Sequence, residues 1–78
     1  MSRKEFTDRV FSFYTHAAGL VVRFHGQKAC YLVSYERPDF APMTSLLAAA
    51  WRSQQVMRVL VEPSLEIVAL VGEAASVA

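Results

Sequence analysis

The 78-residue sequence has a single cysteine and no long apolar run. Its longest apolar runs are about six residues, whereas a transmembrane helix needs about 20, so we expect no membrane insertion. Cys30 cannot form an internal disulfide, and a free thiol fits a reducing compartment. Polar Thr7, Asp8 and Arg9 interrupt the start, where a signal peptide would have an apolar run. We therefore expect a cytoplasmic protein, or a secreted or periplasmic one if a leader naturally precedes this sequence.

The sequence also has no marked excess of either charge sign and no metal-binding motif. Eight basic and seven acidic residues give a net charge of +1, which predicts neither strong phosphate attraction nor steering toward an anionic membrane. His16 and His25 lack a cysteine cluster for zinc and a matched carboxylate or serine for catalysis. We interpret Cys30, in a predicted strand between Ala29 and Tyr31, as a small buried hydrophobe. We expect no enzymatic activity, metal or cofactor.

Apolar residues are abundant, at 54% of the chain. Soluble domains typically contain about 45–50%. We expect one domain over residues 1–78 with an ordered core of about residues 5–73, and a core of this size typically supplies only about 3–5 kcal/mol. The surplus apolar surface is therefore expected to lie in a subunit interface.

Alternation of apolar and polar residues predicts five strands. They cover residues 10–15, 20–24, 29–35, 55–61 and 65–72. Pro38 and Pro42 mark residues 36–42 as the loop that leads into a helix, where Asp39 is a candidate cap. Residues 73–78 are expected to be a disordered tail.

Helical apolar spacing is confined to residues 42–54, PMTSLLAAAWRSQ. The predicted core-facing stripe consists of Met43, Leu46, Leu47, Ala50 and Trp51. For Trp51 the alternative is stacking on a sugar ring. Ala48 and Ala49 leave the opposite side nearly flat. A helix with so few solvating side chains is expected to have neighbours on two sides.

Three strands, a helix and two strands are the element order of an OB-fold. We therefore predict an all-β domain with one helix, in which a five-stranded OB-fold barrel carries its helix between strands 3 and 4.

Several segments resemble the B subunits of bacterial AB-type toxins. Residues 8–15, DRVFSFYT, resemble the D-K-I-F-S-Y-T opening of the cholera and heat-labile enterotoxin B subunits, and residues 19–26, GLVVRFHG, are similar to their second strand and its glycine turn. Residues 43–50, MTSLLAAA, followed by residues 56–61, VMRVLV, resemble the Shiga toxin B subunit, in which L-Q-S-L-L-L-S-A leads into M-T-V-T-I. Residues 66–70, EIVAL, resemble the closing strand of that group.

The resemblance implies an assembly. In that family the subunits pair edge strands around a ring of five, their helices line a central pore, and their outer surfaces bind cell-surface sugars. It implies that Ala48, Ala49 and Arg52 form an oligomer interface on the pore side of the helix. The structural disulfide of the family is absent from this chain.

Two functional hypotheses follow. The first is a non-enzymatic, homo-oligomeric, pentameric binding or scaffold protein with an unidentified ligand, either a glycan or a protein partner, presented at repeated sites. The alternative is single-stranded nucleic-acid binding through aromatic and basic side chains on the strands. Its candidate face consists of Phe13, Tyr14, Arg23, Tyr31 and Tyr35, with Phe24, Lys28 and Arg58 nearby. The small net charge argues against nucleic acid.

Overall fold

The computed structural model describes residues 3–72, which form six strands and one helix. In chain order these are β1 (Lys4–Asp8), β2 (Val10–His16), β3 (Gly19–Phe24), β4 (Cys30–Ser34), α1 (Phe40–Ser53), β5 (Met57–Val61) and β6 (Ile67–Gly72). The tail predicted at residues 73–78 lies outside the described residues. No helix in residues 3–72 is both long and apolar enough to cross a membrane.

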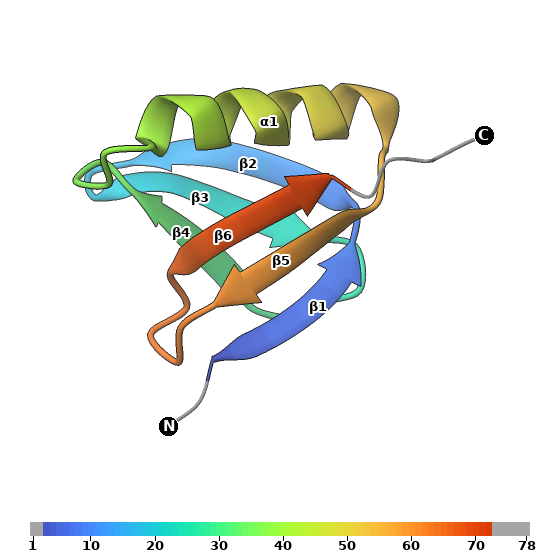
Figure 1. Ribbon diagram of the computed structural model, residues 1–78, viewed down its shortest axis with the longest axis horizontal. Helices are drawn as coiled ribbons and strands as arrows, with labels where there is room; N and C mark the ends of the chain where they lie inside the picture. The colour runs from blue at the N-terminus through green and yellow to red at the C-terminus, as the bar shows by residue number, and fades with distance from the viewer. Residues whose placement is uncertain (1–2, 73–78) are drawn as a thin grey trace.

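The strands form two separate antiparallel sheets, with strand orders β1-β5-β6 and β2-β3-β4. In Figure 1 the first sheet lies in front of the second, and α1 runs along one side of both. One isolated parallel bridge, between Leu32 of β4 and Glu66 just before β6, connects the sheets.

The predicted five-stranded OB-fold barrel is therefore wrong. The strands do not close into a barrel, and the helix lies between the fourth and fifth of six strands. The difference begins with β1, whose sequence KEFTD has no apolar alternation because Phe6 is its only apolar residue. Pairing with β5 makes it a strand all the same, and Phe6 packs against Phe24 and Tyr31 with ring centroids 5.2 and 5.3 Å apart.

The core lies between the two sheets and beneath the helix. Its fully buried side chains come from every layer, with Val22 from β3, Leu47 from α1 and Val59 from β5 each at 0% exposure. Full burial of one such side chain contributes about 1.5–3 kcal/mol. Because inward residues alternate along each strand, the neighbouring positions form an outer face on each sheet.

Local polar contacts mark the two ends of the helix. Asp39 occupies the N-cap position without a side-chain cap bond, so its predicted capping role is replaced by pairing with Arg37. At the other end Gln54 adopts the left-handed conformation, with φ 56° and ψ 37°, and its backbone N–H points to the carbonyls of Ala50 and Trp51. The left-handed residue ends the helix after Ser53.

Candidate oligomer interface

The outer face of α1 is nearly devoid of charge. Ala49 and Arg52 are exposed and Ala48 is half-buried, together with the exposed small residues Ala41 and Ser45 at helical spacing. Arg52 is the only ionisable residue of the helix. Solvated helices usually carry charged side chains on this face, so a surface of methyl and hydroxyl groups allows close approach of another element.

The inner face of α1 packs on the core through Met43, Leu47 and Ala50, which are all buried. Leu46 is half-buried against the same cluster. Trp51 lies at the edge of this stripe and remains 44% exposed. Its ring meets Phe13 of β2 edge to face, with centroids 5.5 Å apart. Trp51 therefore extends apolar surface from the helix to β2.

The four sheet edges differ in how they are protected. β1 carries Lys4, Glu5 and Asp8, and charges on an edge strand discourage pairing with another chain. The edge of β4 is occupied within the chain, because the Leu32 amide donates to the Leu65 carbonyl at 2.9 Å. Both edges are thus poor sites for a further strand.

The edges of β2 and β6 carry no such charges, although α1 packs against both strands and β4 packs against β6. The sequences VFSFYTH and IVALVG contain no lysine, arginine, acidic residue or proline. Arg37 donates to the Val68 carbonyl at 3.1 Å, but Ala69 to Val71 have β5 as their only strand neighbour. Uncharged edge strands of this kind are sites of strand addition.

Exposed large hydrophobic side chains gather at these same two edges. Among the described residues, those with 43–53% exposure are Phe11, Tyr14, Tyr35, Trp51, Leu65 and Val71. Phe11 and Tyr14 lie on β2, and Trp51 contacts that strand through Phe13. Val71 lies on β6 and Leu65 in the turn just before it. Tyr35 lies elsewhere, and its ring is tilted by 55° against the Phe40 ring with the two centroids 5.0 Å apart.

A shallow depression of about 160 Å³ lies on the outer face of the β1-β5-β6 sheet. Its lining residues are Glu5, Arg58, Leu60, Ala69 and Val71. The Glu5 carboxylate and the Arg58 guanidinium meet at 3.3 Å on its rim, while the other three side chains are apolar. The depression borders β6 and is therefore continuous with the uncharged edge.

The predicted nucleic-acid residues do not share one face. Tyr31 is 3% exposed in the core, and Phe13 turns inward beneath Trp51. Tyr35 follows β4 and packs on the start of the helix. Tyr14 and Arg23 remain on the outer face of the β2-β3-β4 sheet. The five residues therefore do not form a continuous stacking platform.

A bulge in β2 between Val10 and Ser12 turns Phe11 outward beside Arg23. The Arg23 guanidinium lies 5.6 Å from the Phe11 ring centroid, and the His25 ring meets Phe11 edge to face at 5.2 Å. The His25 Nε2 atom lies 3.0 Å from the Gln54 Oε1 atom. These contacts hold Phe11 in place by packing and give His25 a structural partner.

Cys30 is exposed, so its predicted burial is wrong. It pairs with Arg23 in the sheet register. Because Tyr31 and Val33 are the inward residues of β4, alternation places Cys30 on the outward side. Within residues 3–72 no group of three or more histidine, cysteine or acidic side chains is arranged to hold a metal ion.

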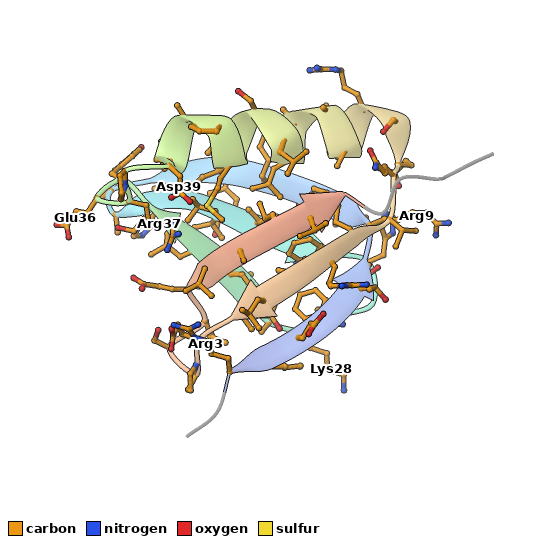
Figure 2. All side chains as sticks on the ribbon, in the orientation of Figure 1. Arg3, Arg9, Lys28, Glu36, Arg37 and Asp39 are labelled. Carbon is orange, nitrogen blue, oxygen red and sulfur yellow. The ribbon has the colours of Figure 1, made fainter. Side chains whose placement is uncertain are left out.

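One ion pair shifts the titration of its members. Arg37 Nε donates to Asp39 at 2.8 Å and its Nη2 donates to the other carboxylate oxygen at 3.1 Å. The hydrogen bond from Arg37 lowers the pKa of Asp39 below its usual value, although partial desolvation opposes the shift. The same hydrogen bond raises the pKa of Arg37. Figure 2 places both residues in the loop before α1.

Sequence reasoning missed the lining of the depression and the role of Gln54. Glu5, Leu60 and Ala69 meet only through the β1-β5-β6 pairing, which no local pattern predicts. Gln54 lies at the end of the predicted helix, but its bond to the Val10 carbonyl, 3.1 Å long, spans 44 positions of the sequence. The apolar character of residues 67–72 was the available signal for the free edge.

In comparisons with known proteins, the chain matches no protein-family profile, no curated protein and no solved structure.

Proposed function

We propose that this protein is a non-enzymatic, self-assembling binding or scaffold protein, in which β2 of one copy pairs with β6 of the next. The observation that carries the proposal is the coincidence of two properties at these two edges. Both strands lack charge and proline, and five of the six most exposed large hydrophobic side chains lie on them or beside them. Strand pairing would satisfy the edge backbone and cover this apolar surface in one step.

Pairing of two different edges is a heterologous contact. Such contacts form a closed ring when a whole number of the rotations between neighbouring copies adds up to 360°. A ring of five follows from the resemblance to toxin B subunits. In such a ring the outer faces of the helices, with Ala48, Ala49 and Arg52, would line the centre. Their small side chains support the proposal because they permit helices to approach closely.

The ring would present identical surfaces several times, so weak individual contacts with a glycan or a protein would add up to useful avidity. The exposed thiol of the single Cys30 suits a reducing compartment such as the cytoplasm. Nucleic-acid binding is not proposed, because its candidate side chains are divided between the core and different surfaces.

The test is the native mass of the protein at micromolar concentration, by light scattering and native mass spectrometry. We expect an oligomer for the natural sequence and a monomer for Val71→Lys, since a lysine on the β6 edge opposes strand addition. Ser64→Lys adds the same charge in the exposed turn before β6 and should leave the mass unchanged. Urea unfolding of each variant verifies that the fold persists.

A natural protein that remains monomeric over the whole accessible concentration range would overturn the proposal. If the protein is an oligomer and neither lysine substitution changes its native mass, β6 is not part of the subunit interface.

A further inference from the structure

The outer face of the β2-β3-β4 sheet combines positive charge with apolar side chains. All seven acidic residues of the chain lie before residue 9 or after residue 35, so these three strands and the turns between them contain none. We propose that this face binds a segment of a partner protein in which a carboxylate lies among apolar side chains. The inference rests on the proposed function, because it names the surface through which each copy would bind its partner.

The strand register brings six outward side chains together in two neighbouring rows. They are Ser12, Arg23 and Cys30 in one row, and Tyr14, Val21 and Leu32 in the other. The positions between the rows face the core, where Val22 and Tyr31 are buried. The two rows lie about 7 Å apart along each strand, and adjacent strands lie about 5 Å apart. The face is therefore a patch that an extended peptide segment can cover.

Arg23 supplies the charge of this patch. The ion pairs recorded within residues 3–72 engage Arg3, Arg37 and Arg58, and none includes Arg23. Its guanidinium instead lies 5.6 Å from the centroid of the exposed Phe11 ring. A cation that stacks on a ring keeps its N–H donors available, and a guanidinium can donate two parallel hydrogen bonds to one carboxylate.

Apolar side chains surround this cation. Phe11 and Tyr14 are about half exposed, and Val21 and Leu32 are half-buried, so a partner that covers them gains free energy from the buried apolar area. Glu66 borders the face, because it forms a bridge with Leu32 at the β4 edge. Repulsion from Glu66 directs a partner's carboxylate away from this edge and toward the centre of the face.

The number of cations favours a protein segment over other anionic chains. A nucleic acid carries a phosphate on every nucleotide, and its binding sites follow the backbone with several cations. In the sequences of β2, β3 and β4, Arg23 is the only lysine or arginine. One carboxylate between apolar side chains, as a peptide supplies, matches this single cation.

Selection from a display library of short random peptides tests the proposal without assuming a sequence. The natural protein is the target, and peptides that bind Arg23→Gln are removed beforehand. We expect the enriched peptides to combine an acidic residue with large apolar residues. Enrichment of peptides without an acidic residue, or no enrichment, would overturn the inference.

Fluorescence anisotropy then measures the affinity for an enriched peptide. Arg23→Gln should weaken binding about tenfold or more, because hydrogen bonds between ionised groups are the stronger ones. Arg58→Gln removes the same charge from the outer face of the other sheet and should leave the affinity unchanged. Equal affinities of Arg23→Gln and the natural protein would contradict the role of Arg23.

The exposed thiol of Cys30 reports where the peptide binds, because Cys30 pairs with Arg23 in the sheet register. A saturating peptide should slow the alkylation of Cys30 by iodoacetamide several-fold, and an unchanged rate would place the binding elsewhere. If oligothymidine or oligogalacturonate protects Cys30 at a lower concentration than the peptide, the partner is not a protein segment.

The proposed face lies within one copy, so Val71→Lys, the expected monomer, should bind the peptide with the same affinity per copy. A natural protein that is monomeric and binds acidic peptides through Arg23 would overturn the proposed assembly and leave this inference standing. An oligomer from which no acidic peptide is selected would overturn this inference alone.

Discussion

Arg37 connects three parts of the chain through one guanidinium group. It makes two hydrogen bonds to Asp39 at the start of α1 and one, 3.1 Å long, to the Val68 carbonyl of β6. The bond to Val68 holds the loop before the helix against the β1-β5-β6 sheet. The same bond occupies one backbone carbonyl of β6.

The lowered pKa of Asp39 predicts how this contact depends on pH. A carboxylate whose pKa is lower in the folded state stabilises the fold above its unfolded pKa, about 3.9, and this contribution is lost as the pH falls through the folded value. Asp39→Asn should therefore have a lower urea midpoint than the natural protein near neutral pH. The two midpoints should converge as the pH falls below the folded pKa.

Glu36→Gln removes a carboxylate from the same loop and leaves the Arg37–Asp39 pair intact, so it serves as the control for the general loss of charge. A gap between Asp39→Asn and the natural protein that stays constant from neutral to acid pH would contradict the assigned role of Asp39.

At the scale of elements, one glutamine connects the C-terminus of α1 to β2 and to the turn that follows β3. Gln54 Nε2 donates to the Val10 carbonyl at 3.1 Å, and its Oε1 lies 3.0 Å from His25 Nε2. Arg9 Nε donates to the Gln54 carbonyl at 3.0 Å. Because its φ is +56°, the residue combines these side-chain contacts with a backbone conformation that favours glycine.

Two substitutions separate the side-chain contacts from the backbone strain. Gln54→Ala loses the side-chain bonds and keeps a Cβ in the left-handed region, whereas Gln54→Gly loses the same bonds but relieves the strain. We expect Gln54→Ala to lower the free energy of unfolding by about 1–3 kcal/mol. Gln54→Gly should be more stable than Gln54→Ala by about 1 kcal/mol. Urea unfolding measures both, and equal stabilities would contradict the importance of the left-handed conformation.

Local patterns predict some elements of this fold better than others. Apolar residues at Met43, Leu47 and Ala50 predict a helix over residues 42–54, and α1 spans Phe40–Ser53. The start differs because the Met43 N–H donates to the Asp39 carbonyl at 3.0 Å, which places Pro42 inside the first turn, where its missing N–H needs no partner. β1 is not predicted, because Phe6 is its only apolar residue and gives no alternation. Its pairing with β5 also spans most of the chain, so no local pattern indicates it.

At the scale of the whole molecule, the number of sheets decides which surfaces are free. Five predicted strands imply a barrel, which leaves few edges, but six strands in two sheets leave four. The sequence indicates an apolar surplus and a small-residue helix face, and these suggest an interface. It does not indicate that β2 and β6 are edge strands, because this depends on the sheet order and on the contacts that occupy β4.

The outer face of α1 lies near the axis of the proposed ring, so a charge on this face should affect assembly. Ala49 is exposed in the single chain, and glutamate is a good helix former, so Ala49→Glu should fold as a monomer with little loss of stability. In the proposed ring the five carboxylates would instead be enclosed near the axis, where burying unpaired charges of like sign is strongly unfavourable. Native mass spectrometry should therefore find monomers for Ala49→Glu, while Ala17→Glu in the β2–β3 turn stays assembled. Because protonation would neutralise the carboxylates, Ala49→Glu should regain the oligomeric mass in mild acid, and an Ala49→Glu protein with an unchanged mass at neutral pH would place the helices away from the axis.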